Sequence, residues 1–315
     1  MNKKGVRVAD LLEADLQLNF QLLTEKADLG KSITSSDINR PGLALAGFFE
    51  HFAGGRVQVF GMGESAYLHS LSSEDLSRCQ SSFFSYAPVC LIFTHDHIPP
   101  EEFTRAAEKA DIPILKTRHS THKLVEIIAE FLDFRMAPRT VIHGVFIEVF
   151  GVGILLRGKP GVGKSETALE LVERGHRLIA DDAVEVARLG EAHLYGYASK
   201  TIEHHMEIRG LGIINIKDLY GSGSVRNSKH IDLLVNLDEW DQSKEYDRLG
   251  IDDLKEKVLD IDVSSITIPI GPGRNIPVLI ENAAKNHNLR LMGRHPAREF
   301  SRMLREKMGE NEAYG

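Results

Sequence analysis

The sequence is poor in cysteine, has no long apolar segment and carries no strong excess of charge. Its only two cysteines, Cys79 and Cys90, are not spaced as a C-x-x-C pair, which argues against a disulfide framework and favours reduced thiols in a cytoplasmic protein. No run of 18 apolar residues occurs, so no membrane-spanning helix is expected, and the first residues lack the apolar core of a secretory signal. The net charge is −7 with acidic and basic residues interspersed, which argues against a nucleic-acid-binding protein.

The composition that is present indicates an ordinary folded protein with two domains. The chain has 315 residues, of which 42% are hydrophobic and 26% charged, enough for two cores. Strand-like and helix-like segments alternate over roughly the first 130 residues, which predicts an α/β domain with no apparent catalytic motif. A proline-bearing stretch at residues 136–141 marks the boundary. We therefore expect an N-terminal α/β domain at 1–134 and a second α/β domain at 135–315.

The second domain contains a glycine-rich phosphate-binding motif. An apolar run at residues 152–156 precedes it and a helix-like segment at 165–174 follows it, which is the strand–loop–helix context of a P-loop. The glycines allow a tight turn in which backbone N–H groups converge on phosphate oxygens at the positive end of the helix. The predicted nucleotide-binding residues are Gly158, Lys159, Pro160, Gly161, Val162, Gly163, Lys164 and Ser165.

Two residues of this motif have specific predicted roles. Lys164 is expected to reach the β- and γ-phosphates, and the Ser165 hydroxyl is expected to bind Mg²⁺. A strand at residues 177–180 then ends in Asp181 and Asp182. If it runs parallel to the strand before the P-loop, both carboxylates lie at the phosphate edge of the sheet, suited to metal binding and proton transfer. Adjacent residues point to opposite faces, so one of the two is expected to face the transferred group; a purely structural role for the pair is equally open.

Three further segments contain residues with possible functions. Residues 206–215 combine two glycines with Glu207 and Arg209, which would share a face of a strand or form a surface ion pair. The loop after residue 270 has Arg274 at its tip. The histidines at 95, 97, 119 and 122 suggest a metal site, but a polar loop at a strand end is the favoured interpretation.

Several segments together resemble the HPr kinase/phosphorylase family. They are the stretch from His143 through the P-loop to Asp182, the segment 207–215, Trp240 with residues 246–250, and the loop 272–275. The resemblance is dense from about residue 138 to 300 and collinear before it. It implies a P-loop catalytic domain behind an N-terminal domain, assembled as a homohexamer.

The resemblance also implies an activity and residue roles. The family uses Mg²⁺ and ATP to phosphorylate a regulatory serine of HPr, the phosphocarrier of the sugar phosphotransferase system, and thereby regulates carbon metabolism. It removes the phosphate with inorganic phosphate, giving pyrophosphate. Asp182 matches the proton acceptor, Lys164 the lysine that neutralises phosphoryl charge, and Ser165 and Glu207 the magnesium ligands. His143 matches an active-site histidine, and Arg248 an arginine of the reverse reaction.

One departure and two other functions remain open. The loop that contains Arg274 is also assigned to the reverse reaction, but Gly271 stands where a second arginine is expected, which leaves the strength of phosphorolysis in question. A P-loop small-molecule kinase or a carboxykinase-like enzyme is an alternative, although no arginine-rich lid segment is evident. A non-catalytic nucleotide switch, with a structural aspartate pair, is another.

Overall fold

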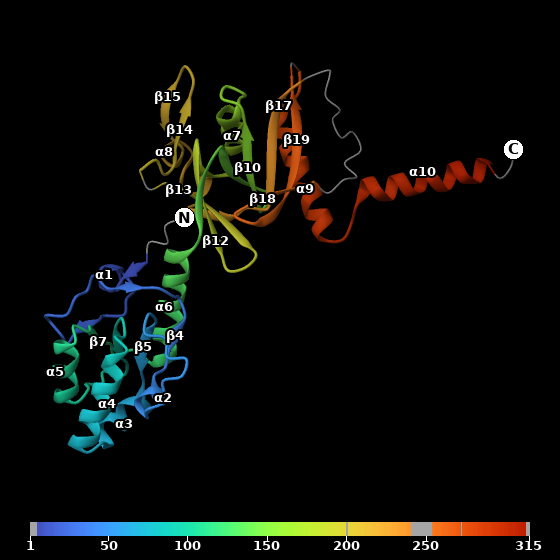
Figure 1. Ribbon diagram of the computed structural model, residues 1–315. Coiled ribbons are helices and arrows are strands. Elements are labelled where there is room, and N and C mark those ends of the chain that lie inside the picture. The colour runs from blue at the N-terminus through green and yellow to red at the C-terminus, as the bar shows by residue number, and fades with distance from the viewer. Residues whose placement is uncertain (1–4, 200, 241–253, 272, 313–315) are drawn as a thin grey trace. The chain divides into compact units, whose positions relative to one another are not determined.

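The computed structural model describes residues 5–199, 201–240, 254–271 and 273–312. The chain divides into two compact units, Met1–Ala137 and Pro138–Gly315, whereas the sequence placed the boundary after residue 134. The α/β fold predicted for the chain is confirmed in both units (Figure 1). No helix among the described residues is long and apolar enough to cross a membrane.

The first unit is a sheet covered by helices on both faces. Its five strands are ordered β2-β7-β6-β5-β4, and β4 through β7 run parallel. One face packs its phenylalanines against α2, α3, α4 and α5, and the other packs valines and isoleucines against α1 and α6. The elements are β1 (Val6–Arg7), α1 (Val8–Glu13), β2 (Gln21–Leu22), β3 (Ser32–Ile33), β4 (Ile38–Asn39), α2 (Gly42–Leu45), β5 (Val57–Phe60), α3 (Met62–Ser70), α4 (Ser73–Ser85), β6 (Leu91–Phe93), α5 (Glu101–Lys109), β7 (Ile114–Lys116) and α6 (Thr121–Met136).

The second unit packs a six-stranded sheet between helices and a smaller sheet. The large sheet has the order β11-β9-β10-β17-β19-β18, and the four-stranded sheet has the order β16-β13-β12-β8. The first strands and helices are β8 (Arg139–His143), β9 (Val145–Val149), β10 (Val152–Gly158), α7 (Lys164–Glu173), β11 (Arg177–Ala180), β12 (Ala183–Leu189), β13 (His193–Ala198), β14 (His205–Ile208) and β15 (Gly212–Asn215). They are followed by α8 (Ile216–Tyr220), a 3₁₀ turn (Ser222–Ser224), β16 (Ser228–His230), β17 (Leu233–Glu239), β18 (Lys255–Val258), β19 (Ile261–Ile270), α9 (Ile276–Leu291) and α10 (Pro296–Glu312).

Strand direction in the large sheet determines where the functional segments meet. β10 runs parallel to β17, and β17 runs parallel to β19. β9 is antiparallel to both β10 and β11, so β11 runs in the same direction as β10 with β9 between them. Helices α7 and α9 cover one face with a core of aliphatic side chains, and the smaller sheet covers the other. The carboxyl ends of β10, β11, β17 and β19 therefore share one edge.

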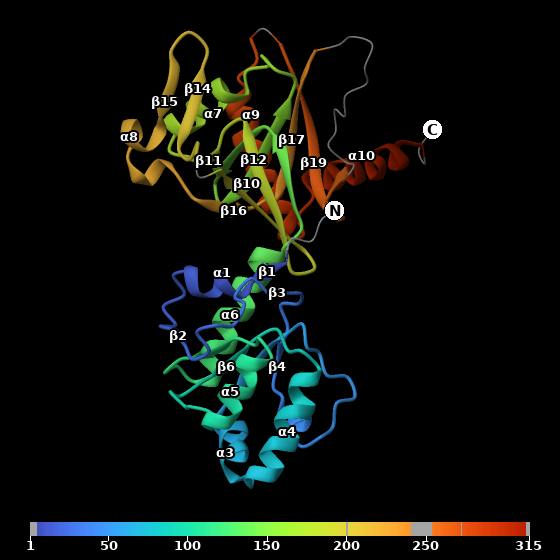
Figure 2. The same cartoon turned by 60° about the vertical axis from the view of Figure 1, so that its left-hand side comes forward.

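Several local predictions are corrected by the structure. The sequence of residues 42–52 predicts a single helix ended by Gly54 and Gly55, but the helix ends at Leu45, since Gly47 takes a left-handed φ of 93°. Alternation of side chains predicts strands at residues 56–61 and 231–237, the first of them half-buried. These strands are β5, which is buried throughout, and β17, which is mostly buried. Residues 206–215 form a hairpin, β14–β15, beside α7 (Figure 2), rather than one strand.

The histidine-rich loops of the first unit form no metal site among the described residues. His119 Nε2 bonds the Gln17 carbonyl at 3.0 Å, and Lys116 pairs with Asp96 at 2.8 Å. His119 and Asp96 are thus used in contacts within the first unit.

Candidate active site

The P-loop joins β10 to α7 through a turn that requires glycine. Gly161 and Gly163 have φ values of 82° and 90°, in the region that a β-carbon disfavours. At Gly158 a β-carbon would lie 2.5 Å from the Leu237 carbonyl oxygen, so only glycine lets the loop pass this close to β17. Helix α7 begins after Gly163 with no side-chain cap, so its first N–H groups are available to an anion.

Lys164 folds back over the loop. Its ammonium donates to the carbonyl oxygens of Gly158 and Lys159 at 3.1 and 3.2 Å. The charge is thereby held over the turn that the motif predicts to enclose phosphate oxygens.

Asp181 lies at the carboxyl end of β11 and faces the P-loop. It is 5% exposed, and it accepts hydrogen bonds from the Ser165 hydroxyl at 3.0 Å and from the Glu207 backbone N–H at 3.2 Å. Burial raises the pKa of Asp181, although these hydrogen bonds oppose the shift. The sequence left open which aspartate faces the P-loop serine, and the structure brings Asp181 to it.

Asp181, Ser165 and Glu207 offer oxygen atoms that could bind a magnesium ion. Magnesium in phosphoryl-transfer sites is held by one or two carboxylates, a hydroxyl and the phosphates, with water completing the octahedron. Here the buried Asp181 carboxylate accepts a hydrogen bond from the Ser165 hydroxyl and another from the backbone N–H of Glu207. Glu207 itself is exposed. The Asp181 carboxylate and the Ser165 hydroxyl are therefore oxygen donors of the right kind at the end of the P-loop, and the Glu207 backbone lies next to them.

Asp182 points away from this cluster and lies beside His143. Their side chains are 85% and 86% exposed, and His143 Nδ1 is 3.9 Å from an Asp182 carboxylate oxygen. Asp182 has a φ of 63°, and its carbonyl accepts from the Gly144 N–H at 3.0 Å, which holds it at the end of β8. Asp181 is thus buried in contact with Ser165, whereas Asp182 is exposed beside His143.

Comparison with known proteins agrees with these two domains. The model of the HPr Serine kinase C-terminal domain matches residues 134–304, and that of the HPr Serine kinase N terminus matches residues 6–132. The chain belongs to the HPr kinase/phosphorylase family.

Curated relatives match over nearly the full length of both chains. The HPr kinase/phosphorylase of Leptospira biflexa is 51% identical over 95% of this chain and 94% of its own. That of Caldanaerobacter subterraneus is 47% identical over 93% of this chain and 96% of its own. The HPr kinase/phosphorylase of Treponema pallidum is 47% identical over 97% of this chain and 96% of its own.

The hairpin of this HPr kinase/phosphorylase family member brings a further cation to the P-loop. Arg209 lies directly after β14, whereas the sequence predicted that it shares a strand with Glu207. Its guanidinium lies so close to Gly161 that a β-carbon there would stand 3.1 Å from Nη1. Spacing by two residues in a strand could not predict this contact, because a turn at Gly210 redirects the chain.

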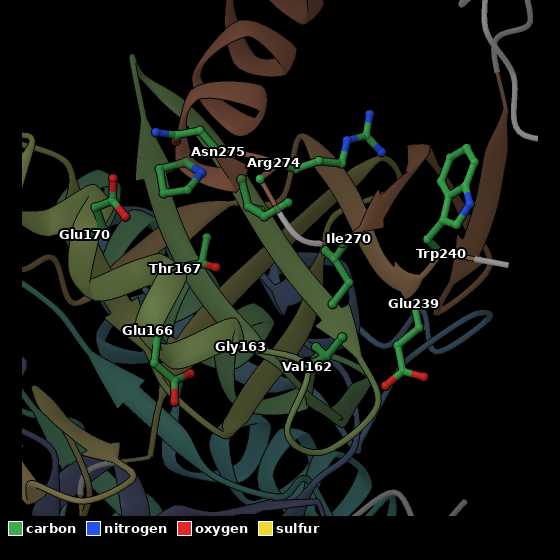
Figure 3. Close-up of a pocket in the computed structure, with 14 residues that line it drawn as sticks. Val162, Gly163, Glu166, Thr167, Glu170, Glu239, Trp240, Ile270, Arg274 and Asn275 are labelled. Atoms are coloured by element: carbon green, nitrogen blue, oxygen red, sulfur yellow. The ribbon is translucent and has the colours of Figure 1, made fainter.

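Two further arginines, Arg248 and Arg274, were expected in the site. Arg248 lies outside the described residues. Arg274 donates from Nη1 to the Pro269 carbonyl, and its guanidinium carbon is 6.0 Å from the centre of the Trp240 ring. Both Arg274 and Trp240 line a cavity of about 890 Å³ beside the P-loop (Figure 3).

Proposed function

We propose that this protein transfers the terminal phosphoryl group of ATP to a regulatory serine of HPr. We further propose that it removes that group by phosphorolysis, with inorganic phosphate as acceptor and pyrophosphate as product. The activity would regulate carbon metabolism in the cytoplasm. Membership of the family and the names of its relatives support the proposal, and the division between Asp181 and Asp182 gives it a structural basis.

The observation that carries the proposal is the open position of Asp182 and His143. Both side chains are more than four-fifths exposed, next to a P-loop whose serine is occupied by a different, buried aspartate. A small-molecule kinase ordinarily encloses its acceptor to exclude water. An exposed base at a sheet edge instead suits a serine presented on the surface of another protein.

In the forward reaction, the serine oxygen forms a bond to the γ-phosphorus while the bond between that phosphorus and the β–γ bridging oxygen breaks. The Asp182 carboxylate takes the serine proton, and His143 lies beside it to orient the carboxylate. Lys164 and the first N–H groups of α7 stabilise the charge on the phosphates. Ser165, Asp181 and Glu207 would hold magnesium, which when bound supplies further neutralisation of phosphate charge.

In the reverse reaction, an oxygen of inorganic phosphate attacks the phosphorus of phosphoserine. The bond to the serine oxygen breaks, and Asp182 passes to that oxygen the proton that the attacking phosphate loses, because the base of one direction is the acid of the other. The products are free serine and pyrophosphate, so atoms and charge balance without another reactant.

The reversal experiment separates the proposed function from its alternatives. Purified protein is mixed with Mg²⁺-ATP and HPr, and the mass of HPr is followed; the ATP is then replaced by inorganic phosphate. We expect a gain of one phosphoryl group and its loss with release of pyrophosphate. Consumption of ATP with a small metabolite but not HPr would favour a metabolite kinase, and nucleotide binding without any transfer would favour a switch.

The same experiment tests the loop that contains Gly271. A gain of phosphate on HPr without subsequent loss would leave the kinase function and contradict phosphorolysis. It would indicate that a loop with Gly271, in place of the expected arginine, holds phosphate too weakly.

Replacing Asp182 tests its role as the base. Asp182→Asn should lower the rate of transfer to HPr at least ~100-fold, the usual contribution of a positioned base, while leaving ATP affinity within about twofold. Stopped-flow transfer assays and calorimetric titration measure the two quantities. Glu185→Gln on neighbouring β12 is the matched control, and transfer at the parental rate in Asp182→Asn would contradict the assignment.

A homohexamer is the assembly that we propose from the family resemblance. Helix α10 supplies a physical reason for self-association, since Phe300, Met303 and Leu304 are 53%, 52% and 45% exposed. Residues three and four apart share a helix face, so these side chains form one apolar surface.

A further inference from the structure

Histidine and tyrosine side chains gather on the outer face of the smaller sheet of the second unit. His193 and Tyr195 alternate along β13, and Tyr195 is paired in register with His230 on the antiparallel strand β16. Residues two apart in a strand, and residues directly opposite across two strands, share a face. Leu194 points the other way, into the core under the sheet. The mechanism proposed above uses none of these side chains.

The imidazole of His230 is held in one orientation. Its Nδ1 lies 2.8 Å from one oxygen of the Asp232 carboxylate, and the other oxygen accepts from the Gly153 N–H at 2.7 Å. A β-carbon at Gly153 would clash with the His230 carbonyl oxygen, so β10 passes this residue closely. The rings of Tyr195 and His230 meet edge to face, with centres 5.8 Å apart. Backbone, carboxylate and a neighbouring ring therefore all position this imidazole.

This orientation leaves the second nitrogen of His230 available. A carboxylate accepts a hydrogen bond only from a protonated nitrogen, so Nδ1 carries the proton and the neutral ring has its lone pair on Nε2. The side chains of His230 and Asp232 are 33% and 24% exposed, so the pair is partly buried but reaches the surface. Histidines that bind metals ordinarily donate their other ring N–H in this way, which orients the ring and raises its basicity.

His193 stands where a second ligand to the same ion would lie. It is the exposed first residue of β13, and the centre of its ring is 5.5 Å from that of His230. With metal–nitrogen bonds of about 2.1 Å, two imidazoles on one tetrahedral ion have ring centres about 5 Å apart. The two spacings agree to within a small side-chain rotation. No group of three or more metal-binding side chains comes together among the described residues, so water would complete the coordination shell.

We propose that His193 and His230 bind a divalent transition-metal ion such as Zn²⁺, with Asp232 as a positioning residue. Imidazole nitrogens suit Zn²⁺, Cu²⁺ and Ni²⁺, whereas Mg²⁺ prefers oxygen ligands. The site is also separate in place from the P-loop, because Gly153 lies near the start of β10 and the P-loop follows the end of that strand. The ion would join β13 to β16, which is an edge strand of its sheet.

Titration of Zn²⁺ into the Mg²⁺-saturated protein, followed by calorimetry, tests the proposal. His193→Gln and His230→Gln should each weaken Zn²⁺ binding at least ~10-fold, and Asp232→Asn about tenfold through loss of the orienting carboxylate. His51→Gln, which changes an exposed histidine of the first unit, is the control and should leave the affinity unchanged. Zn²⁺ should also raise the urea midpoint of the parent but not that of His193→Gln. Equal midpoints of the two proteins without Zn²⁺ show that the variant is folded.

Equal Zn²⁺ affinity of the parent and His193→Gln would overturn the proposal, as would failure of the parent to bind Zn²⁺. Loss of binding in His97→Gln but not in His193→Gln would place the ion in the first unit and would overturn it too. A changed urea midpoint of Asp232→Asn with unchanged Zn²⁺ affinity would contradict the positioning role of Asp232.

Discussion

At the scale of single residues, Asp181 and Asp182 have opposite environments although they are neighbours. Asp181 is buried against Ser165 and the hairpin, and Asp182 is open to solvent beside His143. The left-handed backbone of Asp182 is part of the reason, since it turns the chain out of β11. A buried carboxylate beside the P-loop costs stability, which the fold retains at a candidate functional position.

Replacing Asp181 should reveal this cost. Burial raises the pKa of Asp181 above its value in the unfolded chain. Between the unfolded pKa and the higher folded pKa, the unfolded chain loses the proton more readily than the folded chain does. The free energy of unfolding therefore falls as the pH rises from the unfolded pKa to the folded pKa. Asp181→Asn should therefore stabilise the metal-free protein by about 1 kcal/mol at pH 7, and the gain should shrink toward pH 4. Urea unfolding in EDTA at both pH values measures it.

The control for this prediction is Asp182→Asn, whose exposed side chain should leave the unfolding free energy within about 0.5 kcal/mol of the parent. Mg²⁺-ATP should raise the melting temperature of the parent and of Asp182→Asn, but much less that of Asp181→Asn. A destabilised Asp181→Asn at pH 7 would show that its hydrogen bonds outweigh the burial of charge.

At the scale of secondary-structure elements, a polar network ties together the strands around the P-loop. Arg157, the last residue but one of β10, bonds Asn236 on β17 and Glu256 on β18, and Glu256 also accepts from Ser265 on β19. Partial burial would raise the pKa of Glu256, but hydrogen bonds from Arg157, Ser265 and Asn236 lower it to about 2. The network joins four strands directly before the phosphate-binding turn.

Glu256→Gln should weaken this network. We expect a loss of about 1 kcal/mol at pH 7, a modest value because the carboxylate is partly exposed. A depressed pKa stabilises the fold above the unfolded pKa of 4.5, so the deficit should narrow as the pH falls from 4.5 toward 2. Urea unfolding at pH 7 and pH 3.5 measures the loss of unfolding free energy and its change with pH, with the surface variant Glu191→Gln as control. A loss of the same size at both pH values would contradict a charge effect.

The sequence predicted features that depend on local signals, such as helix ends and the P-loop turn. It missed features that depend on which other elements pack against a segment. Arg174 followed by Gly175 is a sequence signal for the end of a helix, and Gly175 after α7 takes a left-handed φ of 93°. The glycines of the P-loop motif likewise predict its turn. The burial of β5 and β17 could not be predicted from alternation, because it depends on the elements that cover both faces of each sheet. Helices α3 and α4 were not predicted at all; α3 contains Gly63 and serines that weaken a helical pattern.

The candidate site shows the same distinction. The turn at residues 158–165 was predicted from sequence because the glycine spacing of the motif itself determines the shape of the turn. The contact of Arg209 with Gly161 and that of Asp181 with Ser165 join residues far apart in the chain. Only the strand order and the hairpin turn bring them together, and neither leaves a signal in residue spacing.

At the scale of the whole molecule, the apolar face of α10 should cause self-association. The parent is expected to elute at six times its chain mass of 35.1 kDa in size-exclusion chromatography with light scattering. Phe300→Asp combined with Leu304→Asp should shift it to smaller species, because charges on that face must be desolvated in an interface. Arg305→Ala, on another face of the helix, is the control. A monomeric parent, or a double variant of unchanged mass, would contradict the proposal.

The openness of Asp182 has a consequence for how the protein chooses its acceptor. A site that bulk solvent reaches cannot select its nucleophile by exclusion, so water has access to the same terminal phosphoryl group as the serine does. Selectivity must then come from how long and how well the partner protein remains docked. The contact between the two protein surfaces therefore determines which acceptor reacts. Slow hydrolysis of the donor by water is expected whenever no acceptor protein is docked.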